Sequence, residues 1–164
     1  MKLVMHPPRA AVLLALALPL LGLSACGGRE SPAPAGSMQA NASATTNVGG
    51  ATLQVSTMDV ADLNDIVARR YAIERDRSGL MLLVTVRDAS GNGIEPGDLR
   101  LDATVGTLTA APKPLDLHAI ATGGMIDYIG VFNASPPATV RLHISATRNG
   151  ARAEITTTAE LYPR

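Results

Sequence analysis

Two alternating segments joined by Asn149-Gly150 constrain this fold more than any other feature of the sequence. Asn-Gly is the strongest short signal for a two-residue β-hairpin turn. With this turn, strands 140–147 and 152–161 pair so that one face is mostly apolar and the other mostly polar. The apolar face pairs Ala146 with Ala153, Ile144 with Ile155, Leu142 with Thr157 and Val140 with Ala159. A shift of one residue would mix the two faces, so the sequence predicts this register of an antiparallel hairpin.

The same period-two alternation extends back along the chain from about residue 51, with turn signals between the segments. One segment, Leu80 to Val86, is nearly all apolar, as is typical of a central strand covered on both faces. The pattern predicts seven strands, near residues 51–57, 80–86, 99–105, 115–119, 125–132, 140–147 and 152–161. We therefore expect an all-β domain, a seven-stranded antiparallel immunoglobulin-like β-sandwich, with a small closed barrel as the alternative.

One short helix interrupts the strands and is expected between the first two of them. Leu63, Ile66, Val67 and Tyr71 recur at helical spacing, and Asp62 is a plausible N-cap. A helix of about nine residues is only marginally stable by itself, so it should pack against the sheet.

The N-terminal segment has the pattern of an export signal. Lys2 and Arg9 form a positive region before an apolar run from Ala10 to Leu23, which is shorter than the roughly 20 residues of a membrane-spanning helix. The run ends in Leu23-Ser24-Ala25-Cys26, which resembles the lipobox of bacterial lipoproteins. That resemblance implies cleavage before Cys26 and attachment of a diacylglyceryl group to its sulfur. An ordinary secretory signal with an incidental cysteine is the alternative.

Three regions follow from these patterns. Residues 1–25 are expected to be the lipoprotein signal peptide, 26–50 the lipidated cysteine and a flexible linker, and 51–164 the β-sandwich domain. The linker is rich in Gly, Ala, Ser, Pro, Thr and Asn, which bury too little surface to offset the entropy of ordering. Gly27, rather than Asp, follows the cysteine, and by resemblance to known sorting rules this favours an outer-membrane anchor facing the periplasm.

Composition narrows the classes of function. Lys plus Arg and Asp plus Glu both number 14, a balance that argues against a nucleic-acid binder. The single cysteine excludes an intrachain disulfide. With one Phe, three Tyr and no Trp, a base-stacking or sugar-binding aromatic surface is not expected.

Catalytic and metal-binding patterns are weak in the expected domain. His118 and His143 are its only histidines, and the sequence has no Gly-x-Ser-x-Gly nucleophile motif. We therefore expect no enzyme activity and no cofactor. A small periplasmic copper carrier is the alternative, because exported copper carriers use His and Met; the clustered His-x-x-Met spacing is missing. An unrecognised hydrolase is a third possibility.

Positive charge is densest on the expected helix and the loop after it. Arg69, Arg70, Arg75 and Arg77 lie beside Tyr71, and Arg and Tyr are enriched at protein interfaces. These four arginines are the candidate contact with an envelope protein partner. The loop from Asp88 to Gly97, at the opposite end of the sandwich, is the next candidate.

Two stretches resemble a known family. They are Ile66 to Ile73, running through Arg75 into the apolar strand, and Asp127-Tyr128-Ile129-Gly130-Val131-Phe132. With the order of strands, they are similar to the bacterial envelope family called domain of unknown function 4426 (DUF4426), over roughly Thr52 to Leu161. The resemblance implies a small exported domain and no established activity. We expect a non-enzymatic, lipid-anchored lipoprotein that acts as an interaction module.

The lipoprotein assignment leads to a processing prediction. Cys26→Ala should leave an unprocessed or mislocalised precursor, because the acyl acceptor is missing and stable anchoring needs two or more acyl chains. Gel mobility and membrane fractionation measure this. Normal cleavage together with unchanged membrane association in the variant would refute the assignment.

Overall fold

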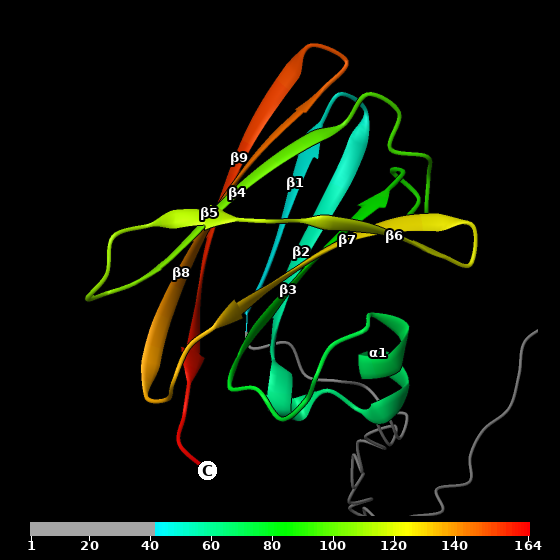
Figure 1. Ribbon diagram of the computed structural model, residues 1–164. Coiled ribbons are helices and arrows are strands. Elements are labelled where there is room, and N and C mark those ends of the chain that lie inside the picture. The colour runs from blue at the N-terminus through cyan, green and yellow to red at the C-terminus, as the bar shows by residue number, and fades with distance from the viewer. Residues whose placement is uncertain (1–41) are drawn as a thin grey trace, which may run out of the picture. The chain divides into compact units, whose positions relative to one another are not determined.

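The computed structural model describes residues 42–164. The signal segment, Cys26 and the linker up to residue 41 lie outside the described residues. The described part is an all-β fold with two antiparallel sheets and very little helix (Figure 1). The strands are β1 (Ala42–Val48), β2 (Ala51–Asp59), β3 (Gly79–Arg87), β4 (Arg100–Thr107), β5 (Lys113–Leu115), β6 (His118–Thr122), β7 (Met125–Asn133), β8 (Ala138–Arg148) and β9 (Ala151–Leu161). The helices are the 3-10 turn η1 (Val60–Asp62) and α1 (Asp65–Arg70), between β2 and β3.

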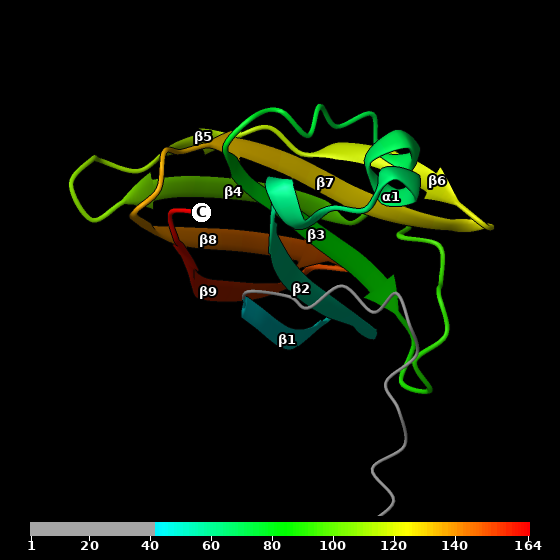
Figure 2. The ribbon, with the colours of Figure 1, turned by 90° about the horizontal axis from the view of Figure 1, so that it is seen from below.

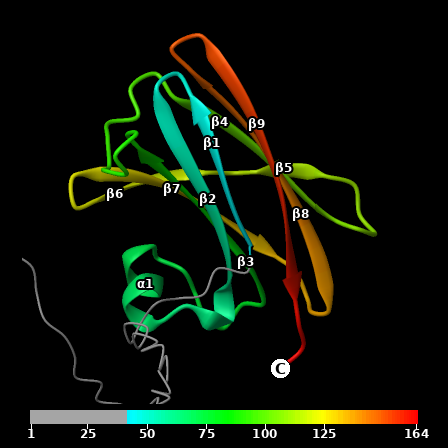
Figure 3. The ribbon, with the colours of Figure 1, turned by 180° about the vertical axis from the view of Figure 1, so that it is seen from behind.

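The strands form two layers. Sheet A has the order β1-β2-β3-β7-β6, and sheet B has the order β5-β4-β8-β9. Figure 2 shows the two layers stacked, with α1 on the side of sheet A that faces away from sheet B. At one side of the sandwich β1 lies against β9, although the two strands belong to different sheets (Figure 3).

The strand count differs from the sequence prediction, because the described residues hold nine strands and not seven. The predicted strand 115–119 is divided into β5, at the edge of sheet B, and β6, at the edge of sheet A. The chain crosses between the sheets at Asp116 and Leu117. Such a crossing cannot be seen in the sequence pattern, because apolar and polar residues alternate without interruption from β5 into β6.

The other additional strand is β1, which lies in the segment 26–50 that we expected to be a flexible linker. It pairs with β2 through a turn at Gly49 and Gly50, from Ala42 opposite Thr57 to Val48 opposite Ala51. Its small and polar side chains gave no apolar signal. The backbone ladder with β2 and the proximity of β9 order it instead.

The helix prediction is wrong in its position and its cap. α1 follows the second strand, because β1 precedes β2, and its N-cap is Asn64, whose Oδ1 accepts from the Val67 amide at 2.9 Å. Asp62 ends η1, whose own N-cap is Asp59. Two short helical turns therefore stand where one longer helix was expected.

The predicted hairpin register is confirmed. β8 and β9 pair Ile144 with Ile155 and Leu142 with Thr157, around Asn149, which has a φ of 50°, and Gly150. Alternation along the strands predicts six core residues: Val84, Leu101, Tyr128, Phe132, Leu142 and Ile144. Four of them are buried, whereas Leu101 and Tyr128 are only partly buried.

Strand β3 is covered on both faces, as its apolar sequence predicts. Leu80, Leu82 and Val84 join the main core between the sheets, whereas Met81 belongs to a second apolar cluster on the outer face of sheet A. α1 covers that second cluster with Ala68 and Val67.

Gly130 explains how β7 fits between its neighbours. A Cβ at Gly130 would lie about 3.0 Å from side-chain atoms of Leu115 and Leu117. Leu115, at the end of β5, and Leu117, in the crossing to β6, fill the space beside this glycine.

Burial of Leu142 leads to a stability prediction. Leu142→Ala should lower the free energy of unfolding by about 2–5 kcal/mol, because the side chain is fully buried and its removal leaves a cavity. Chemical denaturation measures the loss. Ile66→Ala is the control, since Ile66 is 65% exposed and should change stability by less than about 0.5 kcal/mol. Equal effects of the two variants would contradict this assignment of the core.

Candidate functional site

The outer side of α1 combines an exposed apolar side chain with positive charge. Ile66 is 65% exposed, although Ala68 and Val67 of the same helix pack on sheet A. Arg69 and Arg70 follow Ile66 by three and four residues, so all three side chains lie on neighbouring parts of the helix surface. Both arginines are exposed.

The four arginines predicted to contact a partner differ in their local pairing. Arg75 forms an ion pair with Asp65, and Arg77 Nη2 lies 2.6 Å from Glu74 Oε2. Within residues 42–164, no salt bridge involves Arg69 or Arg70. Arg75 and Arg77 thus bring their own acidic neighbours to this surface. Arg70 lies beside the Tyr71 hydroxyl.

Tyr71 attaches this end of α1 to sheet A. Its hydroxyl donates to Asp127 Oδ2 at 3.3 Å, and the Asp127 side chain is buried. Burial is the main cause that raises the pKa of Tyr71, and the Asp127 carboxylate adds to it, while Arg70 acts in the opposite direction. Asp127 lies opposite Thr85 of β3, whose buried Oγ1 has no hydrogen-bond partner. The tyrosine therefore supplies a hydrogen bond that this buried carboxylate needs.

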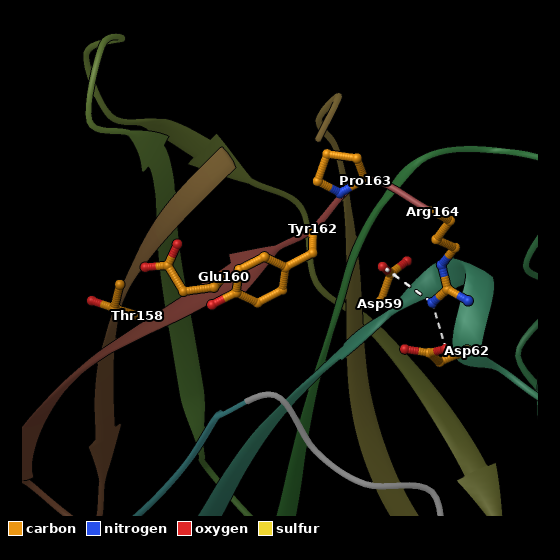
Figure 4. Close-up of a pocket in the computed structure, with 7 residues that line it drawn as sticks. All are labelled: Asp59, Asp62, Thr158, Glu160, Tyr162, Pro163 and Arg164. Carbon is orange, nitrogen blue, oxygen red and sulfur yellow. Dashed lines mark hydrogen bonds and ion pairs between the residues drawn. The ribbon is translucent and has the colours of Figure 1, made fainter. Parts of the chain in front are cut away.

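A second candidate is a hollow of about 370 Å³ beside the last residues of the chain (Figure 4). The Arg164 guanidinium reaches across it to both Asp59 and Asp62. Thr158 and Glu160 of β9 and the exposed Tyr162 form the other wall. Since the Arg164 guanidinium already pairs with both aspartates, a ligand that used them would have to displace a side chain of the same chain.

The two histidines lie on different sheets. His143 Nε2 lies 2.9 Å from Glu154 Oε2, and its Nδ1 lies 3.2 Å from Thr156 Oγ1. Hydrogen bonding from Arg152 is the largest cause that lowers the pKa of Glu154. His118 is on β6, at the far edge of the other sheet. In the part of the chain that the structure describes, no three His, Cys, Asp or Glu side chains are grouped to hold a metal ion.

The three methionines within residues 42–164 have other surroundings. Met58 and Met81 are buried in the apolar cluster beneath α1. Met125 Sδ accepts a hydrogen bond from Arg87 at 3.1 Å. In the described residues, His118 and His143 thus lie on different sheets, and Met58 and Met81 are buried away from both faces of sheet B.

The loop from Asp88 to Gly97 is held by its own polar groups. Asp88 Oδ1 accepts from the amides of Ser90, at 2.8 Å, and Asn92, at 2.9 Å. Hydrogen bonding from the Asn92 backbone is the main cause that lowers the pKa of Asp88. This order, without an exposed large apolar side chain, makes the loop a weaker candidate than α1.

Sequence reasoning identified the arginines but missed their surroundings. The Tyr71–Asp127 contact joins residues 56 positions apart, and Arg164 meets Asp59 across 105 positions. The exposed Ile66 was placed with the apolar residues of the helix; the short, two-part helical segment turns it outward.

None of the helices between residues 42 and 164 has the length and apolar character needed to cross a membrane.

Comparison with known proteins identifies the fold. The family model "Domain of unknown function (DUF4426)" matches residues 45–164. A crystal structure of a DUF4426 family protein from Pseudomonas aeruginosa is similar, with a TM-score of 0.59 and 17% identity over 74% of this chain and 96% of that chain. FetP of uropathogenic Escherichia coli is similar, with a TM-score of 0.50 and 9% identity, over 74% of this chain and 94% of the FetP chain. A copper-bound FetP variant gives a TM-score of 0.44 and 8% identity, over 72% of this chain and 92% of the variant's chain. Among curated proteins, none matches.

The Tyr71–Asp127 contact leads to a prediction. Tyr71→Phe should lower the free energy of unfolding by about 1–3 kcal/mol, because it leaves a buried carboxylate without this donor. Tyr128→Phe is the matched control, since within residues 42–164 no hydrogen bond of its hydroxyl is present. Thermal and urea unfolding compare the two. If Tyr71→Phe proved as stable as Tyr128→Phe, the contact would not hold α1 in place.

Proposed function

Because the chain belongs to the DUF4426 family, whose function is unknown, we propose a function from its own surface: a non-enzymatic interaction module of the bacterial envelope. In this proposal, the exposed side of α1 makes the contact. The observation that carries this proposal is Ile66, which is 65% exposed and lies beside Arg69 and Arg70. An apolar side chain next to arginines is typical of the centre of a protein interface.

The charges indicate the chemistry of the partner. The C-terminal end of α1 carries Arg69 and Arg70, while Arg75 and Arg77 lie in the loop that follows. An acidic protein surface with an apolar pocket for Ile66 would match this arrangement. Opposite charges would speed association and set the orientation of the complex. Arg75 and Arg77 would exchange their present partners, Asp65 and Glu74, for acids of the other protein.

A lipid anchor at Cys26 is part of the same proposal. It rests on the sequence pattern Leu23-Ser24-Ala25-Cys26, which lies outside the described residues. The anchor would hold the domain at the outer membrane, facing the periplasm. It would also raise the local concentration of the domain for a partner in the same envelope.

A copper carrier remains the alternative function. The similarity to FetP supports a shared fold. An identity of 9% gives no basis for assigning a ligand of FetP to this chain. His118 and His143 lie on separate sheets, with Met58 and Met81 buried beneath α1. These positions favour the interaction module. Tight, stoichiometric copper binding by the purified protein that is lost in a His118→Ala/His143→Ala variant would reverse the preference.

Charge reversal on α1 tests the interaction module. The double variant Arg69→Glu/Arg70→Glu should weaken partner capture by at least about tenfold, a loss of ~1.4 kcal/mol or more. Crosslinking and pull-down of the full chain from its native envelope measure capture. The thermal midpoint should change little, because exposed charges contribute little to stability.

The matched control has the same change in charge at another surface. Arg100→Glu/Arg141→Glu alters two exposed arginines of sheet B and should leave capture unchanged. Ile66→Asp should weaken capture as the α1 double variant does. If both double variants captured partners as the wild type does, the α1 surface would be excluded and the loop from Asp88 to Gly97 would be tested next.

A further inference from the structure

One edge strand of the described sandwich lacks the features that normally prevent an edge from pairing with another chain. Edge strands expose unpaired backbone groups, and proteins protect them with proline, charge or covering segments. In sheet B, β5 contains Lys113 and Pro114. β1 and β9 lie against each other (Figure 3). β6, with the sequence His-Ala-Ile-Ala-Thr, has neither proline nor a Lys, Arg, Asp or Glu residue.

The hairpin between β6 and β7 determines which backbone groups of β6 face outward. Gly123 and Gly124, with φ of 57° and 83°, form a two-residue turn that places Thr122 opposite Met125. The pair that flanks such a turn is a hydrogen-bonded pair, and bonded and non-bonded pairs then alternate. The N–H and C=O groups of Ala119 and Ala121 therefore point away from β7. Both alanine side chains are exposed, so no bulk shields these groups.

The side chains of β6 are compatible with antiparallel pairing to the same strand. Centred on Ile120, this pairing sets Ala119 opposite Ala121 and His118 opposite Thr122. Two copies of Ile120 then meet on the outer face of sheet A, where Ile120 is half-buried beside the cluster beneath α1. No charged side chain faces a like charge, and no large side chain blocks the approach.

We propose that β6 pairs with β6 of a second copy of this chain, antiparallel and about a two-fold axis at Ile120. The two copies of sheet A become one continuous sheet. Ala119 of each copy exchanges backbone hydrogen bonds with Ala121 of the other. Five residues per copy make a small contact, below the roughly 1,200 Å² of a stable interface, so the dimer is weak at low concentration.

Disulfide trapping in the full chain tests this weak pairing. Ile120→Cys places two cysteines directly opposite in a non-bonded pair, where Cβ atoms lie about 4.5–5.5 Å apart, close enough for a disulfide after a small adjustment. Under mild oxidation, Ile120→Cys should form linked dimers at least about tenfold faster than Thr158→Cys, because pairing raises the effective concentration. Thr158 is an exposed residue of β9 and serves as the control. Wild-type chain, with Cys26 alone, gives the background.

The register has its own test. His118→Cys alone should crosslink no faster than the Thr158→Cys control, because position 118 faces position 122 of the other copy. A mixture of His118→Cys chains and Thr122→Cys chains should form mixed dimers. Unchanged thermal midpoints show that each variant is folded. Equal crosslinking by folded Ile120→Cys and Thr158→Cys would overturn the proposal, and fast crosslinking of His118→Cys alone would overturn the register.

Discussion

Strand β3 needs cover on both faces, because every residue from Gly79 to Val86 except the half-buried Leu83 is buried. Sheet B covers the inner face, where Leu82 and Val84 meet Leu142 and its neighbours. Nothing in an antiparallel sandwich covers the outer face, and exposed Met81 and Leu83 would leave an apolar patch. The short segment between β2 and β3 supplies that cover, so the position of α1 follows from the sequence of β3.

This arrangement gives α1 two roles. Six residues are too few to form a stable helix alone, so the contacts of Ala68 and Val67 with the sheet hold it. Tyr71 adds a polar attachment to the buried Asp127. A helix fixed in this way presents its outer residues in one orientation, which reduces the entropy lost when a partner binds. Ile66 and the two adjacent arginines would therefore lose less conformational entropy when they contact a partner.

Sequence patterns predicted those strands and registers that are determined by residues close together in the chain. The turn at Asn149 and Gly150 with its flanking alternation predicted β8, β9 and their register, and the apolar run predicted the two-sided burial of β3. β1 was missed because its order comes from the ladder with β2 and not from apolar side chains. The arginines of the candidate site could be found by composition. The Tyr71–Asp127 contact could not, since it depends on how β7 lies beside β3.

The two proposed surfaces are linked by the cluster on the outer face of sheet A. Ala68 of α1 belongs to this cluster and Ile120 of β6 packs against it, so the helix and the edge strand share one apolar cluster. Pairing of β6 about a two-fold axis at Ile120 keeps the outer faces of both copies on the same side of the joined sheet. The two α1 surfaces would then face the same direction, and a partner with two acidic sites would bind both. A partner that binds both α1 surfaces at once would be held far more tightly than by one surface alone, although each single contact stays the same size.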